Sequence, residues 1–283
     1  MPQPTVRMGE RGAAVRQLQG LIGARADGVF GRRTEVLLAE AQRGLGLLPD
    51  GVCGPLTWKA LGWLPEVERL GPTPHRYHLG RRPNLIQPPE AVVLHYTASP
   101  RGPGPYGADY DRIARWAAGG PRVSSTHLVV LRDGRVIQMA PLYDRAWHAP
   151  FKSSGRLVNA LEIEGEQLAP NSHALGVDLE SVGWLKLRGG DLVNAYGGRY
   201  TGPTPFYDER RRPWEPPTPP QLDALARVLA ELGRRLPVLA SSPEARVVGH
   251  SEINHRGGRV DPGPALSMAW AREQVARGER SAR

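Results

Sequence analysis

Apolar residues in the first part of the chain recur at the three- to four-residue spacing of amphipathic helices. One apolar stripe contains Val15, Leu18, Leu21 and Ile22. A second stripe contains Val36, Leu37, Ala41 and Leu45. A third helix is expected after residue 57. The three helices together predict a small all-α domain over residues 5–64.

A repeated turn sequence separates these helices. The pattern D-G-V-x-G-x-x-T occupies residues 27–34 and again residues 50–57. The Asp-Gly pair that opens each copy is typical of a tight turn, because glycine adopts a positive φ without steric cost. The closing threonine, Thr34 or Thr57, can cap the helix that follows or lie just inside it. Each copy therefore predicts a turn that leads into a helix.

The helical pattern ends near residue 64. Residues 65–78 are rich in proline and arginine and are predicted to be a linker, so that residues 79–283 form a second domain. Apolar runs in this domain predict strands, and the run over 128–139 predicts a hairpin because Asp133-Gly134 divides it. The other predicted strands are 91–94, 174–181 and 246–249.

A longer helix is predicted to begin at Thr218. The sequence T-P-P-Q over 218–221 has the form of a capping box, with proline in the first turn, and leucines follow on one helical face. Strands mixed with helices indicate an α/β domain with a mixed central sheet flanked by helices. Residues 183–217 form a long polar stretch, for which a lid over the substrate and an insertion without function are both open.

Composition excludes several classes of protein. A length of 283 residues suffices for two domains. No apolar run approaches the roughly 20 residues of a membrane span, and the first residues lack the apolar segment of a secretory signal. We therefore expect a protein that is made in the cytoplasm. The single cysteine, Cys53, excludes a disulfide framework, and it replaces Phe30 of the other repeat as a small buried apolar residue.

The net charge of +9, from 37 basic and 28 acidic residues, adds a weaker indication. It suits an anionic partner, either nucleic acid, lipid or a wall polymer, but a solvated surface explains it as well. Arg210–Arg212 is the longest contiguous basic run in the sequence, and no nucleic-acid-binding motif is apparent. We therefore expect no nucleic-acid partner.

Three polar residues lie where they can form a metal site. His95 follows the predicted strand 91–94, His250 follows the strand 246–249, and Asp261 lies in the segment after it. Two imidazoles and a carboxylate suit Zn²⁺ and would leave its fourth position to water. Spacing alone leaves open that each is an ordinary structural residue.

The N-terminal domain resembles the type 1 peptidoglycan-binding domain. The resemblance rests on both repeats and on Gly9, Gly12, Val15, Leu18, Gln19, Gln42 and the sequence T-W-K-A-L over 57–61. Ala41 departs from it, because the family usually has an aromatic residue before the glutamine. The resemblance implies that this domain binds peptidoglycan.

Five motifs occur in the second domain in a fixed order. They are VVLHYTAS (92–99), STHLVVLRDGRVIQMAP (125–141), DRAWHAP (144–150), NSHALGVDLES (171–181) and GHSEINHRGGRVDPGP (249–264). In this order they resemble the type 2 N-acetylmuramoyl-L-alanine amidases, a zinc family. The resemblance implies that His95, His250 and Asp261 bind Zn²⁺. It also implies that zinc-activated water cuts the amide bond between N-acetylmuramic acid and L-alanine.

The resemblance suggests further catalytic and binding residues. The family's catalytic carboxylate corresponds to Asp178, one methylene shorter than the usual glutamate. Glu180 is the alternative, because strand alternation predicts that both side chains lie on one face. Arg259 replaces a frequent lysine and is expected to stabilise an oxyanion electrostatically. The candidate substrate-binding residues are His127, Trp147 and His148.

These interpretations predict a monomeric peptidoglycan hydrolase that acts at the bacterial cell wall, as a phage endolysin or a bacterial autolysin. Peptidoglycan and anionic envelope polymers are the expected partners. The main alternative is a non-catalytic peptidoglycan-recognition protein. A zinc D,D- or L,D-peptidase is a further alternative, but its S-x-H-x-x-G-x-A-x-D pattern is absent, since Ser125-Thr126-His127 continues into LVVLRDG.

Overall fold

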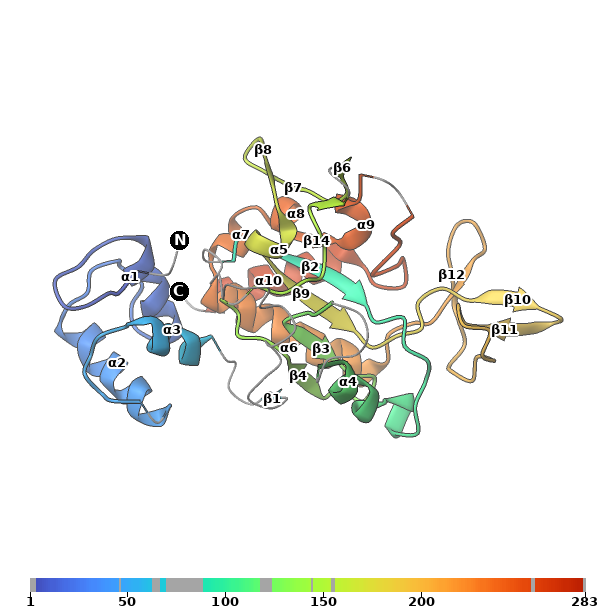
Figure 1. The fold of residues 1–283 in the computed structure, drawn as a ribbon, viewed down its shortest axis with the longest axis horizontal. Coiled ribbons are helices and arrows are strands. Elements are labelled where there is room, and N and C mark those ends of the chain that lie inside the picture. Colours follow the sequence, from blue (N-terminus) through green and yellow to red (C-terminus); the bar gives the residue numbers. More distant parts are fainter. Residues whose placement is uncertain are drawn as a thin grey trace.

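The computed structural model describes residues 4–45, 47–62, 67–69, 89–117, 124–143, 145–153, 156–255 and 258–281. A small helical domain lies at one end, a domain built on a sheet lies in the middle, and an arm projects at the other end (Figure 1). Within these described ranges, no helix is both long and apolar enough to cross a bilayer.

The helical domain contains the three predicted helices, α1 (Ala13–Leu21), α2 (Arg32–Gly44) and α3 (Pro55–Leu61). The two repeats make equivalent contacts. The side-chain amide of Gln19 donates to the Asp27 carboxylate at 2.9 Å and to the Thr34 hydroxyl at 3.1 Å. The equivalent bonds from Gln42 reach Asp50 at 2.8 Å and Thr57 at 3.2 Å. Thr34 lies inside α2 and Thr57 inside α3. Each glutamine therefore ties the turn, and the helix after it, to the preceding helix.

The apolar face of α2 differs from the predicted one. Val36 is 43% exposed, whereas Leu38 is fully buried and Ala41 and Leu45 pack against the same core. Leu38, Ala41 and Leu45 follow the i, i+3, i+7 spacing of one helical face, at whose border Leu37 is half-buried, whereas Val36 lies outside it. Cys53 is buried as predicted.

The second domain is built on a mixed six-stranded sheet with the order β1-β4-β3-β9-β2-β14. Neighbouring strands are parallel except for the predicted hairpin of β3 and β4, which is antiparallel. The strands are β1 (Glu68–Arg69), β2 (Ala91–Tyr96), β3 (Leu128–Val130), β4 (Val136–Gln138), β9 (Ala174–Leu179) and β14 (Val247–Gly249). The two residues of β1 belong to the predicted linker 65–78, whose remaining residues, except Val67, lie outside the described part of the chain.

Long helices cover one face of this sheet. α6 (Pro219–Arg235) and α10 (Met268–Ser281) share one core with Val92 and Leu94 of β2. Thr218 caps α6 as predicted, because its hydroxyl accepts a hydrogen bond from the backbone N–H of Gln221 at 3.3 Å. Side chains alternate along a strand, so Val93 and His95 lie on the opposite face.

Smaller elements surround that opposite face. They are the 3-10 turn Pro105–Gly107 and α4 (Tyr110–Ala117), the hairpin of β5 (Lys152–Ser153) and β6 (Arg156–Leu157), the hairpin of β7 (Leu161–Ile163) and β8 (Glu166–Leu168), α5 (Pro170–His173), α8 (Pro243–Arg246) and α9 (His250–Ile253). The short helix α7 (Val238–Ser241) packs instead in the core of α6 and α10, through Leu239. Val93 packs in a cluster with residues of β7 and α9, and Val129 packs with α4. The side chains at the carboxyl end of β2 therefore lie between these two clusters.

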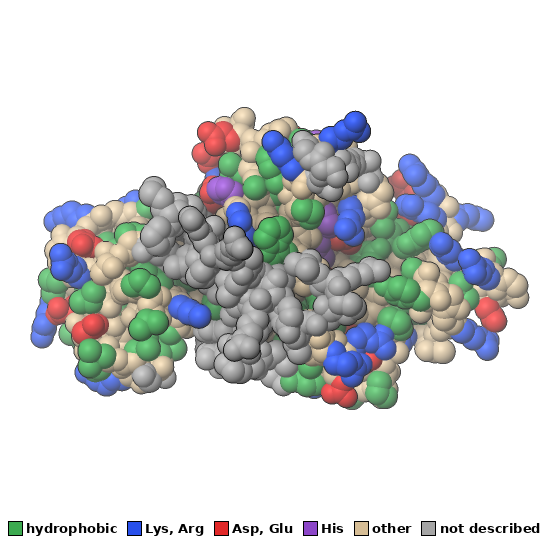
Figure 2. All heavy atoms as spheres, in the orientation of Figure 1, with side chains coloured by type: hydrophobic (Ala, Val, Ile, Leu, Met, Phe, Trp, Pro, Cys, Tyr) green, Lys and Arg blue, Asp and Glu red, His purple; other side chains and the backbone are tan. Residues whose placement is uncertain are grey.

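The stretch 183–217 forms an arm rather than a structureless loop. It contains one hairpin, β10 (Lys186–Arg188) with β11 (Asp191–Val193), and a second, β12 (Phe206–Tyr207) with β13 (Pro213–Trp214). Lys and Arg side chains gather on it at the right of Figure 2. At its base, buried Glu215 accepts a hydrogen bond from the Val182 backbone at 2.7 Å and pairs with Arg132 at 2.9 Å and Arg101 at 2.7 Å. These bonds fix the base of the arm to the sheet domain.

The helical domain is in direct contact with the sheet domain. The rings of Trp58 and Tyr143 meet edge to face, with centroids 6.1 Å apart. The carbonyl of Gly62 accepts hydrogen bonds from the Leu142 backbone and from the Gln138 side chain, both at 2.9 Å. One buried apolar cluster includes residues of both domains. The two domains therefore share a core.

Candidate metal centre

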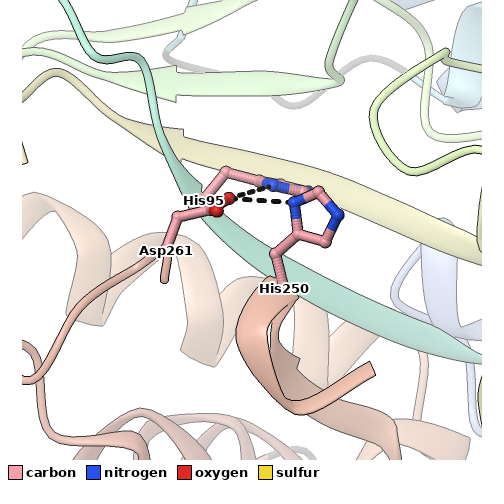
Figure 3. A group of neighbouring side chains, drawn as sticks. All are labelled: His95, His250 and Asp261. Atoms are coloured by element: carbon pink, nitrogen blue, oxygen red, sulfur yellow. Dashed lines mark hydrogen bonds and ion pairs between the residues drawn. The ribbon is translucent and has the colours of Figure 1, made fainter. Parts of the chain in front are cut away.

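The three predicted metal ligands lie together at the carboxyl ends of two adjacent parallel strands (Figure 3). His95 is near the end of β2, His250 follows β14 as the first residue of α9, and Asp261 lies in the segment after α9. The Nδ1 atoms of His95 and His250 are 2.9 and 3.0 Å from the same oxygen of Asp261, Oδ2. All three side chains are buried, and one ligand atom from each lies within 4.8 Å of the other two.

The charges of these groups suit a cation. Burial alone would raise the pKa of Asp261, but the neighbouring imidazoles of His250 and His95 outweigh it and hold that pKa far below its usual range. Burial lowers the pKa of His250 in spite of the neighbouring carboxylate. The site therefore combines an ionised carboxylate with a neutral imidazole. Two imidazole nitrogens and one carboxylate oxygen are a common ligand set of catalytic Zn²⁺.

Asp178 lies beside this cluster. It is the register partner of His95 on the neighbouring parallel strand β9, so both side chains lie on the same face of the sheet. Its side chain is buried. Burial is the main cause that raises its pKa; the charge of Asp261 adds to this effect, and His95 opposes it.

Glu180 does not join Asp178 at the metal centre. β9 ends at Leu179, so the predicted strand alternation does not extend to Glu180. The two carboxylate oxygens of Glu180 accept hydrogen bonds from the backbone N–H groups of Asp109 at 2.8 Å and Arg132 at 3.1 Å. The carboxylate also pairs with the Arg132 guanidinium at 3.0 Å. Glu180 is thus part of the buried network that includes Glu215.

Arg259 is exposed and lies close enough to influence the site. Its positive charge lowers the pKa of His250 and opposes the rise in the pKa of Tyr96.

Burial is the main cause that raises the pKa of Tyr96, and Asp261 adds to it. Tyr96 was not singled out in the sequence, although it directly follows His95. Gly183 leaves room for its ring, since a Cβ there would lie 2.3 Å from Cζ of Tyr96.

The three predicted substrate-binding residues lie in different surroundings. His127 is fully buried, and its Nδ1 accepts a hydrogen bond from the Gly176 backbone at 3.0 Å. Its expected place near the substrate groove stays a prediction. Trp147 is 38% exposed, with the guanidinium of Arg145 5.9 Å from the ring centroid. His148 is half-buried, and its Nδ1 lies 3.0 Å from Nε2 of His95.

A buried amide contacts the second histidine. Oδ1 of Asn159 lies 3.1 Å from Nε2 of His250. The sequence analysis did not identify Asn159. Its position is a consequence of tertiary structure, since an isolated bridge joins it to Asn254, just after α9.

Comparisons with known proteins agree with this arrangement. Residues 86–264 match the N-acetylmuramoyl-L-alanine amidase family, and residues 10–61 match a putative peptidoglycan-binding domain. The chain is 27% identical over 222 residues to the 1,6-anhydro-N-acetylmuramyl-L-alanine amidase AmpD of Citrobacter freundii, which covers 75% of this chain and 90% of AmpD.

Solved structures of amidases are also similar. A selenomethionine derivative of AmpD has a TM-score of 0.44 at 23% identity, over 78% of this chain and 96% of that one. AmiD from E. coli, in complex with anhydro-N-acetylmuramic acid-L-Ala-D-gamma-Glu-L-Lys, has a TM-score of 0.43 at 23% identity, over 69% of this chain and 61% of that one. The family match covers well over half of the chain and contains all three clustered side chains. The chain therefore belongs to the N-acetylmuramoyl-L-alanine amidase family and carries a peptidoglycan-binding domain at its N-terminal side.

Proposed function

We propose that this amidase is a zinc enzyme that cuts peptidoglycan at the amide bond between N-acetylmuramic acid and L-alanine. The observation that carries the proposal is the convergence of two imidazole Nδ1 atoms on one carboxylate oxygen, in a chain of the amidase family. His95, His250 and Asp261 would hold the ion. Bound Zn²⁺ would lower the pKa of a water molecule and polarise the amide carbonyl.

Asp178 is the group that we expect to move the proton. A carboxyl group that acts as a general acid and base lies beside the reacting atoms, and a pKa raised toward neutrality suits it to both roles. Asp178 meets both conditions, because it is buried and is the register partner of His95. It would accept a proton from the attacking water and donate it to the leaving amine of L-alanine. Glu180 is less suited, since its oxygens are bonded to Arg132 and to Asp109.

Arg259 and Trp147 are expected to contact the substrate. An arginine guanidinium keeps its proton, so Arg259 can stabilise a developing oxyanion through its charge but does not act as a proton donor. Its charge already acts on His250. The partly exposed face of Trp147 offers an apolar wall on which a sugar or peptide group can pack.

The N-terminal domain supports action on the polymeric wall rather than on small fragments alone. Its shared core with the sheet domain keeps a peptidoglycan-binding module at a fixed position relative to the metal centre. We infer that the protein acts on the wall as a monomer, in the manner of an endolysin or an autolysin. The exposed Arg188, Arg210 and Arg211 of the arm would add attraction to anionic envelope polymers.

Mass spectrometry of digested peptidoglycan tests the proposal. Purified sacculi are incubated with the protein, with and without a zinc chelator, and the released products are identified. Stem peptides that begin with a free L-alanine amine, and that disappear with the chelator, are the expected result. Cleavage at another peptide bond would instead indicate a peptidase. Retained binding to sacculi without any cleavage would indicate a recognition protein and contradict the proposal.

A further inference from the structure

In His95 and in His250, one ring nitrogen faces Asp261 and the other faces away from it. The hydrogen bond of the far nitrogen determines whether the near nitrogen can bind a metal ion. A neutral imidazole carries a proton on one nitrogen and a lone pair on the other, and the partner of one nitrogen decides the state of both. Only a nitrogen with a lone pair can bind a metal ion. The partners of the far nitrogens of His95 and His250 are therefore informative.

His148 is the partner of His95. Nε2 of His148 lies 3.3 Å from the carbonyl oxygen of Ala174, which can only accept, so this nitrogen carries the proton. Nδ1 of His148 then holds a lone pair and accepts a hydrogen bond from Nε2 of His95 at 3.0 Å. With its proton on Nε2, His95 directs the lone pair of Nδ1 toward Asp261.

Asn159 has the same effect on His250 through an independent contact. The Asn159 amide nitrogen donates to the carbonyl of Pro150 at 2.9 Å, which fixes the orientation of the amide. Its oxygen accepts from the Asn254 side chain at 2.8 Å and faces Nε2 of His250 at 3.1 Å. Nε2 of His250 must therefore carry the proton, and the lone pair of Nδ1 is directed toward Asp261.

We propose that His148 and Asn159 are positioning residues that hold both histidines in the form in which Nδ1 binds Zn²⁺. This inference rests on the proposed zinc site. Without a cation, two lone pairs and a carboxylate oxygen would face one another at about 3 Å with no proton between them. Hydrogen bonds to the far nitrogen of a metal-binding histidine commonly fix its ring and strengthen its affinity for the metal.

The surroundings of His148 support a positioning role rather than contact with substrate. Asn171 holds its backbone in place, because the Asn171 side-chain oxygen accepts from the N–H groups of His148 at 3.0 Å and Ala149 at 2.7 Å. The imidazole packs against Gly176 of β9, where a Cβ atom would lie 2.8 Å from Cγ of His148. The ring is therefore fixed between the strand and His95.

Zinc affinity, measured by competition with a chromophoric chelator, tests this inference. His148→Phe keeps an aromatic ring but removes the acceptor for His95, and Asn159→Leu removes the acceptor for His250. We expect each variant to bind Zn²⁺ about 10- to 100-fold more weakly than the wild type. His173→Gln is the matched control, because the His173 side chain pairs with Glu90 and with none of the three clustered residues, so its loss should leave the affinity unchanged.

Nitrogen-15 NMR of the zinc-loaded wild-type protein gives a second test that needs no variant. We expect the histidine spectra to show Nδ1 bound to the metal and Nε2 protonated in both His95 and His250. Equal zinc affinity of all variants, or metal bound through Nε2, would overturn the inference while leaving the proposed function intact. A wild-type protein that binds no zinc would overturn both.

Discussion

Asp178 is the direct register partner of His95, whereas Glu180, two residues later, is bonded to Arg132 away from the metal centre. This separation is why we propose Asp178, and not Glu180, as the group that transfers the proton. We expect Asp178→Asn to lower kcat by about 10²- to 10⁴-fold, because the amide cannot accept or donate the proton. Zinc affinity and melting temperature should stay close to those of the wild type. Turnover of a soluble muropeptide, with metal content measured on the same sample, checks the prediction.

Glu180→Gln serves as the comparison for that variant. It replaces the carboxylate that pairs with Arg132 by a neutral amide of similar shape, and activity below its melting temperature should persist. Persistent activity in Asp178→Asn together with its loss in a folded Glu180→Gln variant would reverse the assignment of the two carboxylates.

Arg259→Ala tests the role of the exposed cation. If the guanidinium stabilises the oxyanion, its removal should lower kcat by about 10²- to 10³-fold with little effect on zinc affinity. Arg259→Lys keeps the charge and should recover part of the loss, although a lysine lacks the forked geometry. A large change in KM with unchanged kcat would instead indicate that Arg259 only binds substrate.

Glu215 is expected to stabilise the base of the arm. Glu215→Gln leaves Arg132 and Arg101 with a weakened partner in a buried position, so we expect a loss of about 3–5 kcal/mol in the free energy of unfolding. Denaturant unfolding of the full chain measures it. Glu166→Gln, at an exposed position of β8, is the control and should change the stability little.

The same residue predicts a dependence on pH. Burial opposes ionisation of Glu215, but hydrogen bonds and the charge of Arg132 outweigh it and lower its pKa. A carboxylate with a depressed pKa stabilises the fold above its unfolded pKa of about 4.3, and this contribution is lost as the pH falls through its folded pKa. The wild type should therefore lose stability below about pH 4 more steeply than Glu215→Gln. The contribution of Glu180 to stability has the opposite pH dependence. Burial raises its pKa, so that contribution is lost as the pH rises through its folded pKa. Acid unfolding curves that run parallel for the wild type and Glu215→Gln would contradict this account.

The shared core predicts that the two domains unfold together. Tyr143 is fully buried against Trp58, and its truncation removes apolar contacts from both domains. We expect Tyr143→Ala to cost about 3–5 kcal/mol and to separate the single calorimetric transition into two. Tyr207→Ala, at an exposed position of the arm, should leave one transition at the wild-type temperature. Two transitions in the wild type would show that the domains are independent.

The sequence was sufficient for the main features of the fold because they depend on local patterns. The repeated D-G-V-x-G-x-x-T turn, the Asp133-Gly134 hairpin and the cap at Thr218 each specify their own element, and all are present. Parallel strands have their carboxyl ends at the same edge of a sheet. Because His95 and His250 lie at such strand ends, their proximity was predictable as well.

Other features depend on packing between distant segments. Strand alternation predicted that Glu180 and Asp178 lie on one face, but β9 ends at Leu179 and the Glu180 carboxylate pairs with Arg132. Asn159 reaches His250 only because a bridge brings its loop to the end of α9. The hairpins of the arm are short, and their base is fixed by Glu215 from beyond both hairpins, so no local periodicity marks them.

Titration of zinc into chelator-treated protein, followed by cleavage of peptidoglycan in the same samples, tests the central claim most directly. Release of peptides with an amino-terminal L-alanine should rise in proportion to bound zinc and reach its maximum at one ion per chain. His250→Ala should show no such rise. Full cleavage by metal-free protein, or no cleavage at any zinc content, would contradict the account.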